Sequence, residues 1–161
     1  QLQIDGKPTM WSNTTGWKAA RSPITYDSLY NGEAYDARRA AEVDGWTSPG
    51  FDDAAWDVAQ VASSVANHAV LSSALFEPTI AVDSLPPVSI SSPTAGVQVI
   101  DFGQNLAGVV RLTGFRCTRG QQVTIRHAEL LMHPPYGPRN GSIYTGNLRK
   151  ANATDVYTCL G

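Results

Sequence analysis

Short stretches that alternate apolar and polar residues, separated by turn-forming residues, constrain this chain more than any other feature of its sequence. Residues 122–128 are the clearest example, because they alternate in the manner of a half-buried β-strand. The other candidate strands are residues 17–20, 29–36, 79–82, 97–102, 108–113 and 155–160. The strands that begin at residues 97, 108 and 122 start about 10–14 residues apart with no helix between them, which predicts an antiparallel β-sandwich.

Helical periodicity is scarce. The best candidate, residues 54–73, is alanine-rich and only loosely amphipathic, so we expect one short turn after Asp52 and Asp53 and no long helix. No apolar run approaches the roughly 18 residues that a membrane-spanning helix needs. The basic residues of the second half are spaced along candidate strands rather than clustered, which argues against a nucleic-acid surface. The sequence therefore predicts an all-β chain with neither a membrane nor a nucleic acid as partner.

Charge divides the chain into two parts. Residues 1–85 contain five Lys and Arg residues against eleven Asp and Glu residues, whereas residues 86–161 contain seven against three. Prolines and serines gather between residues 86 and 94, where the composition changes. Together these features predict two domains, residues 1–88 and residues 89–161.

Both domains are expected to be incomplete. Cores of this size are marginal without neighbours. Residues 156–160 are expected to form a sheet edge that needs a further strand. The chain starts with Gln1 and lacks the basic start and apolar stretch of a secretory signal, so we expect it to be a processed or excised piece of a longer protein.

Three N-x-S/T sequons suggest a secreted glycoprotein. They begin at Asn13, Asn140 and Asn152, which are the candidate glycosylation sites. The chain contains two cysteines, Cys117 and Cys159. In a secreted protein they are candidates for one disulfide bond, and otherwise they are two free thiols.

Residues with catalytic side chains do not form a convincing active site in this sequence. His127 and Glu129 have the H-x-E spacing of zinc deaminases, but the P-C-x-x-C partner is absent, and we expect a hydrogen-bonded structural pair instead. Asp52 and Asp53 are adjacent on one predicted turn, whereas the two carboxylates of a glycosidase must face each other across a cleft. Their expected role is to cap a turn. We therefore assign no catalytic residue.

The acidic turn around residues 29–38 is the best candidate for a binding site. Asn31, Glu33 and Asp36 offer oxygen atoms that can contact sugar hydroxyls. Tyr30, Tyr35 and Trp46 offer flat rings on which a sugar can stack. Asn31 and Asp36 are the candidate ligands of a calcium ion, which prefers such oxygen donors. The alternative is that Arg38 forms an ion pair with Glu33 or Asp36 and stabilises a sheet edge, with no ligand bound.

Motifs spread over nearly the whole chain resemble a known family. They are Trp17–Ala20, Leu29–Glu33, Tyr35–Arg38, Gly45–Trp46, Pro49–Asp53, Trp56, Asp101–Asn105, Gly108, Arg111, His127–Glu129, Tyr144–Thr145, Asn147–Arg149, Ala153–Asp155 and Tyr157. In order and spacing they resemble the amino-terminal region of bacterial and fungal α-L-rhamnosidases, glycoside hydrolase family 78. Residues 132–137 are similar to the fungal branch, which agrees with the sequons.

This resemblance implies a secreted, multidomain hydrolase. It implies that residues 1–88 are part of a jelly-roll or galactose-binding-like sandwich and that residues 89–161 begin a concanavalin-like sandwich. In the family, an (α/α)6 barrel carries the acidic residues that remove terminal α-L-rhamnose with inversion, and that barrel would be a partner domain outside these residues. The family also implies calcium-dependent rhamnose binding on the first sandwich, around Asn31 to Asp36, where this sequence has Asn31 and Gly32 in place of an Asp-Asn type pair.

Three hypotheses about function follow from the sequence. In the first, the chain is a non-catalytic scaffold of an α-L-rhamnosidase. In the second, the chain is also a module that binds rhamnose-containing glycans or glycosides through Asn31, Glu33, Asp36 and Trp46. In the third, these residues only determine the fold, and no ligand binds.

Overall fold

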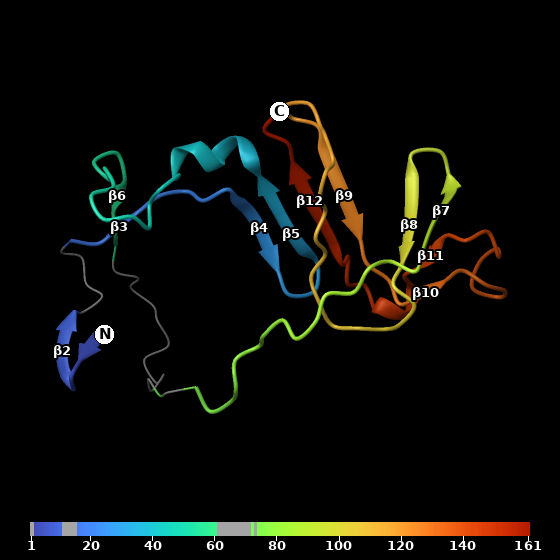
Figure 1. The fold of residues 1–161 in the computed structure, drawn as a ribbon, viewed down its shortest axis with the longest axis horizontal. Coiled ribbons are helices and arrows are strands. Elements are labelled where there is room, and N and C mark those ends of the chain that lie inside the picture. The colour runs from blue at the N-terminus through green and yellow to red at the C-terminus, as the bar shows by residue number, and fades with distance from the viewer. Residues whose placement is uncertain (1, 11–15, 61–71, 73) are drawn as a thin grey trace. The chain divides into compact units, whose positions relative to one another are not determined.

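The computed structural model describes residues 2–10, 16–60, 72 and 74–161 (Figure 1). The strands are β1 (Leu2–Ile4), β2 (Lys7–Met10), β3 (Lys18–Ala19), β4 (Ile24–Ser28), β5 (Gly32–Asp36), β6 (Asp57–Val58), β7 (Ser89–Thr94), β8 (Val97–Asp101), β9 (Gln122–Arg126), β10 (Leu130–Leu131), β11 (Ile143–Tyr144) and β12 (Thr154–Thr158). Two short 3-10 helices, η1 (Ala37–Glu42) and η2 (Gly146–Leu148), are the helical elements of the described residues. The all-β prediction is therefore confirmed, and none of the described helices is long and apolar enough to cross a membrane.

The chain forms two compact units. The first comprises residues 1–23 and 39–77, and the second comprises residues 24–38 and 78–161. Compactness thus groups residues 24–38 with the second half of the chain. The domain division at 88/89 was drawn from composition and stays a prediction.

The described strands of the first unit form two small antiparallel ladders. One joins β1 to β2, and the other joins β3 to β6 through the pairs Lys18 with Val58 and Ala19 with Asp57. The turn predicted after Asp52 is present, because the Asp52 carboxylate accepts a hydrogen bond from the Ala54 N–H at 3.0 Å. Most of the helical candidate, residues 61–71 and 73, lies outside the described residues.

The second unit is built on a four-stranded sheet in the order β4-β5-β12-β9 (Figure 1). β12 pairs antiparallel with β9 and parallel with β5, so this sheet is mixed rather than purely antiparallel. The expected edge at residues 156–160 is therefore wrong, because β12 has a neighbouring strand on each side. A parallel neighbour was unpredictable from local pattern, since β5 lies more than a hundred residues earlier in the chain.

Other strand predictions had mixed outcomes. Residues 97–102 and 122–128 contain β8 and β9, and residues 32–36 of the predicted 29–36 form β5. Residues 108–113 and 79–82 form no strand, although both are apolar. Apolar residues alone do not make a strand without a neighbour to accept their backbone hydrogen bonds. The helix η1 was not predicted.

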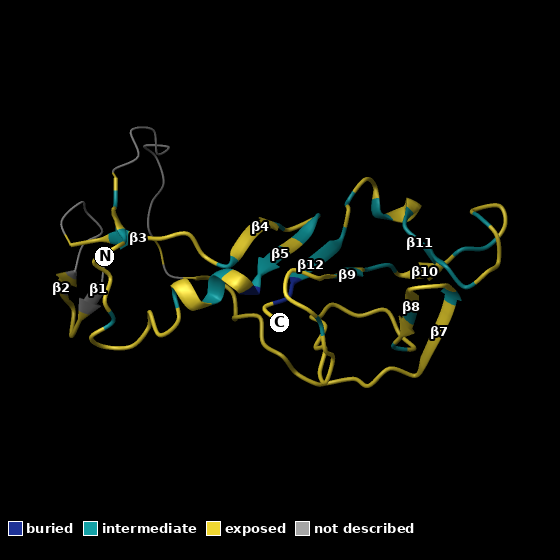
Figure 2. Cartoon of the chain, turned by 90° about the horizontal axis from the view of Figure 1, so that it is seen from above, coloured by how far each residue is buried: buried dark blue, intermediate teal, exposed yellow. Residues whose placement is uncertain are grey.

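Burial is concentrated at one end of the central strands (Figure 2). Among the described residues, Ala37, Thr158 and Cys159 are buried, with exposed fractions of 5%, 8% and 0%. Cys159 forms a disulfide bond with Cys117, so the pairing considered from the sequence is present. On the sheet, Tyr35 of β5 stacks on Tyr157 of β12 with ring centroids 5.8 Å apart.

Candidate functional site

The turn between β4 and β5 is held against the segment that leads into β12. The Asn31 side-chain carbonyl accepts a hydrogen bond from the Asn152 N–H at 3.1 Å, and its amide donates to the Tyr26 hydroxyl at 3.2 Å. The Asn31 backbone carbonyl accepts from the Thr154 N–H at 3.0 Å. Asn31 therefore joins two segments that are distant in sequence, which is a structural role whether or not it also contacts a ligand.

Gly32 makes this close approach of the backbones possible. Its φ angle is +94°, in the region that residues with a Cβ avoid. A Cβ at this position would overlap the Thr154 backbone and lie 2.7 Å from the Asp155 carboxylate. The close approach of the Thr154 backbone thus accounts for glycine at position 32.

Asp155 of β12 contacts both β5 and the residue that follows β9 through its carboxylate. One oxygen accepts a hydrogen bond from the Glu33 backbone N–H at 2.8 Å, and the other lies 2.8 Å from His127 Nε2. Partial burial would raise the pKa of Asp155, but the hydrogen bonds from His127 and Glu33 outweigh it and the pKa is lowered. Only the backbone of Glu33 makes this contact, and residue 33 is exposed.

The predicted hydrogen bond between His127 and Glu129 is wrong, because each side chain has another partner. His127 contacts Asp155, whereas the Glu129 carboxylate accepts a hydrogen bond from the Asn147 side chain at 3.1 Å. β9 ends at Arg126, so the strand alternation that would have put both side chains on one face does not extend to them. Within the described part of the chain, no three His, Cys, Asp or Glu side chains are grouped as a metal site would require.

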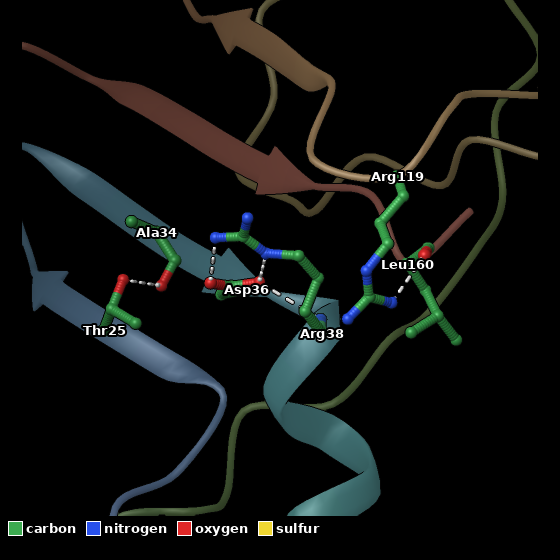
Figure 3. Close-up of polar contacts among 6 residues, drawn as sticks. All are labelled: Thr25, Ala34, Asp36, Arg38, Arg119 and Leu160. Atoms are coloured by element: carbon green, nitrogen blue, oxygen red, sulfur yellow. Dashed lines mark hydrogen bonds and ion pairs between the residues drawn. The ribbon is translucent and has the colours of Figure 1, made fainter.

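Asp36 is bound by Arg38 in a two-pronged ion pair (Figure 3). Arg38 Nε and one terminal nitrogen donate to the two carboxylate oxygens at 2.8 and 2.7 Å, and the Arg38 backbone N–H donates at 3.1 Å. This contact raises the pKa of Arg38. The ion pair considered as the alternative is therefore formed, with Asp36 rather than Glu33 as the partner.

Three of the residues predicted to bind sugar, Asn31, Glu33 and Asp36, are spread along β5 and the residue before it rather than gathered at one point. Asn31 and Asp36 flank the extended segment at opposite ends of β5, about 16 Å apart at the usual rise per strand residue. Calcium ligands lie about 2.3–2.6 Å from the ion. An ion bound at the turn would therefore use Asn31 without Asp36. Trp46, with 60% of its surface exposed, belongs to the other compact unit.

The turn presents aromatic rings that the sequence only partly indicated. Tyr30 is 70% exposed and Tyr26 is 50% exposed, and Tyr26 contacts Asn31 directly. Tyr26 was missed because nothing in the sequence shows that β4 folds back onto the turn. The sequence also suggested Tyr35 as a stacking surface, but one face of its ring is stacked on Tyr157.

The candidate glycosylation sites differ in what the structure describes. Asn140 and Asn152 are both exposed, whereas Asn13 lies outside the described residues. The Asn140 side chain accepts a hydrogen bond from the Ser142 N–H at 3.1 Å. The hydroxyl of Thr154 donates to the Asn152 carbonyl at 2.8 Å.

Two protein families together match most of the chain. Residues 1–83 match the α-L-rhamnosidase N-terminal domain, and residues 92–161 match the bacterial α-L-rhamnosidase concanavalin-like domain. With the all-β structure, these matches confirm two successive β-sandwich units as the fold class.

The similar proteins are α-L-rhamnosidases that are much longer than this chain. The chain is 41% identical to an α-L-rhamnosidase of Streptomyces avermitilis and 34% identical to one of Alteromonas sp. (strain LOR), over 100% and 98% of its own length. It spans only 15% and 16% of those two proteins.

Solved structures of α-L-rhamnosidases superpose on this chain. A crystal structure of the Streptomyces avermitilis α-L-rhamnosidase complexed with L-rhamnose superposes with a TM-score of 0.75 and 41% identity, covering 90% of this chain and 13% of that one. The Aspergillus terreus α-L-rhamnosidase superposes with a TM-score of 0.66 and 28% identity, covering 98% of this chain and 17% of that one. The chain therefore belongs to the α-L-rhamnosidase family and corresponds to its N-terminal and concanavalin-like domains.

Proposed function

We propose that this chain is a non-catalytic accessory region of an enzyme that hydrolyses terminal, non-reducing α-L-rhamnose from α-L-rhamnosides. The observation that carries the proposal is the match of the chain to an N-terminal domain and a concanavalin-like domain of α-L-rhamnosidases, while it spans only 15% of the Streptomyces avermitilis relative. Its main partner is then the catalytic domain of the same polypeptide. The chain serves as scaffold for that domain and as a surface over which the substrate approaches.

The direct test is an assay with an aryl α-L-rhamnoside. The isolated chain is expected to release no chromophore above the buffer rate, and a longer polypeptide that includes the rest of the relatives' length is expected to release it. Release by the isolated chain that is abolished by substituting His127 or Glu129 would contradict the non-catalytic assignment.

A second proposal concerns carbohydrate binding at the turn between β4 and β5. Asn31 and Tyr30, whose ring is exposed, are adjacent in sequence there, and Glu33 is exposed on the following strand. The Streptomyces avermitilis relative was solved with L-rhamnose. These observations support a rhamnose site at the turn, with calcium as a cofactor that Asn31 would help to hold.

Isothermal titration with L-rhamnose, with calcium and again with EDTA, tests this site. Tyr30→Ala removes only an exposed ring, and it is expected to weaken binding about threefold to tenfold if the ring stacks on the sugar. Leu29→Ala is the matched control, because Leu29 is 91% exposed on the same turn. Equal binding by both variants, or no calcium-dependent heat, would favour the purely structural role of these residues.

We also propose that the protein is secreted and glycosylated. The disulfide bond between Cys117 and Cys159 supports an oxidising compartment, and the sequons at Asn140 and Asn152 are on exposed residues. Expression through a eukaryotic secretory pathway, followed by enzymatic deglycosylation and peptide mass spectrometry, is expected to convert Asn140 or Asn152 to aspartate. Unmodified asparagine at Asn13, Asn140 and Asn152 would contradict the glycosylation proposal.

A further inference from the structure

Two asparagines of the chain are followed directly by glycine, at Asn31-Gly32 and at Asn140-Gly141. In such a pair the backbone nitrogen of the glycine can attack the side-chain carbonyl carbon of the asparagine, because the glycine has no Cβ to hinder the approach. An asparagine in this position can therefore lose its amide group without an enzyme. The structure places the two pairs in different surroundings, which decide how readily each can react.

The side chain of Asn31 is held by hydrogen bonds at both ends. Its carbonyl accepts from the Asn152 N–H, and its amide donates to the Tyr26 hydroxyl. Gly32 lies in β5, which pairs with β4, and a Cβ on Gly32 would overlap the Thr154 backbone. A ring that joins the Gly32 nitrogen to the Asn31 side chain would have to break these contacts. The fold therefore opposes the reaction at Asn31.

Asn140 lies in the loop between β10 and β11, whose residues are exposed or half-buried (Figure 2). Asn140 is itself exposed. Gly141 has a φ of +80°, and a Cβ built on it would come near only Pro93, at 3.8 Å. Within the described part of the chain, the Gly141 N–H donates to no acceptor. The nitrogen that would attack is therefore not committed to another contact.

The backbone of Ser142 supplies a further part of the reaction. Its N–H donates to the Asn140 side-chain carbonyl at 3.1 Å, which keeps that side chain folded toward the backbone of the intervening Gly141. When the Gly141 nitrogen attacks, negative charge develops on the carbonyl oxygen. An N–H that is already aimed at this oxygen stabilises the charge. The loop thus positions both the nucleophile and a donor for the developing oxyanion.

We propose that Asn140 is a site of spontaneous deamidation. The electron pair of the Gly141 nitrogen forms a bond to Cγ of Asn140, the bond between Cγ and Nδ2 breaks, and Nδ2 leaves as ammonia with the proton that the Gly141 nitrogen gives up. The product is a cyclic imide. Water then adds to one of its two carbonyls and opens it to aspartate or to isoaspartate, in which the chain continues through the side chain. One water is consumed, one ammonia is released, and the loop gains a negative charge.

Asn140 is also a candidate glycosylation site, and the two modifications exclude each other. A glycan is attached to Nδ2, which is the atom that leaves in deamidation, and aspartate has no Nδ2 to carry a glycan. Deamidation needs only water, so it does not depend on the proposed function or on glycosylation. Aspartate that is present at position 140 before any deglycosylating enzyme is added reports deamidation rather than a glycan.

Peptide mass spectrometry of the complete chain tests the proposal, with protein from a host that adds no glycan and incubation at mildly alkaline pH. Conversion at Asn140 is expected to be at least about tenfold faster than at Asn31, which corresponds to a barrier about 1.4 kcal/mol lower. In concentrated urea the two pairs should react at similar rates, because the fold no longer distinguishes them. Equal rates in the folded chain, faster conversion at Asn31, or no conversion at Asn140 would overturn the proposal.

Gly141→Ala tests the role of the glycine nitrogen. The added methyl group hinders the attack, and conversion at Asn140 is expected to slow about tenfold, again a change of about 1.4 kcal/mol in the barrier. Gly96→Ala is the matched control, because Gly96 has a similar φ of +77° and lies in another turn. This control should leave the rate at Asn140 unchanged. An unchanged rate in Gly141→Ala, with a spectrum that shows a folded chain, would also overturn the proposal.

Discussion

The two compact units differ in how far along the sequence their contacts reach. In the second unit, β5 pairs with β12, and Glu33 is held by Asp155, 122 residues later. In the first unit, the pairing of β3 with β6 joins residues about 40 positions apart, and the pairing of β1 with β2 joins residues fewer than ten positions apart. The buried residues among those described, Ala37, Thr158 and Cys159, all belong to the second unit.

This difference shows that a domain match in sequence and a compact unit in space need not share a boundary. Residues 24–38 fall within the match to the N-terminal domain, yet they supply β4 and β5 to the sheet that contains β9 and β12. The stability of these two strands therefore depends on residues of the other domain match. Four predictions test this dependence on β12, from the largest expected effect to the smallest.

Removing the disulfide bond should produce the largest effect. Cys117 and Cys159 are 42 residues apart, and closing a loop of this length in the unfolded chain is worth about 3–4 kcal/mol. The double variant Cys117→Ala with Cys159→Ala is expected to lower the free energy of unfolding by about that amount in urea titrations. Hydrogen exchange should accelerate in β5 and β12 much more than in β3 and β6. Equal acceleration in both units would contradict the difference between them.

Substituting Gly32 tests the contact between β5 and the start of β12. Gly32→Ala adds a Cβ that meets the Thr154 backbone at a φ of +94°, and we expect a loss of about 2–3 kcal/mol in thermal or urea unfolding. Gly96→Ala is the matched control, because Gly96 has a φ of +77° with nothing within 4 Å of the added atom. The control should lose only about 1 kcal/mol from backbone strain. Similar losses in the two variants would show that the close approach at Gly32 is unimportant.

The sequence could predict elements whose signal is local. The alternation in residues 122–126 and the glycines around residues 97–101 were enough to place β9 and β8. The position of β12 as an inner strand was not predictable, because parallel pairing with β5 leaves no mark in either strand's own pattern. The apolar residues 108–113 were misleading for the same reason, since strand formation depends on a partner elsewhere in the chain.

The candidate site was likewise predictable where its contacts are local and not where they are long-range. The chemistry of Asn31, Asp36 and Arg38 was visible in the sequence, and the ion pair of Arg38 joins residues only two positions apart. The links from Asn31 to Asn152 and from His127 to Asp155 require the folded chain. Residue types thus indicated which side chains could interact, whereas the fold decided which of them met.

Asp155→Asn tests the polar link between β5, β12 and His127. The pKa of Asp155 is lowered in the folded chain, so its carboxylate stabilises the fold above the ordinary aspartate pKa of about 3.9. That contribution should disappear as the pH falls below about 4 through the lower folded pKa. Because the side chain is 43% exposed, we expect a loss of only about 1 kcal/mol at neutral pH. Stability measured against pH should therefore differ between wild type and variant at pH 7 and converge in acid; a constant difference would contradict the lowered pKa.

The ion pair of Lys18 with Asp53 should give the smallest effect and belongs to the first unit alone. The two groups are 2.8 Å apart, but their side chains are 31% and 53% exposed, so water and salt screen the attraction. Lys18→Met keeps most of the aliphatic stem and is expected to cost about 0.5 kcal/mol, with less at 1 M salt. Hydrogen exchange of β5 and β12 should not change, because the ion pair belongs to the first unit and both strands belong to the second. Faster exchange in β5 and β12 would show that a change in the first unit destabilises the second. The two units would then not be energetically independent, although their contacts differ in sequence separation.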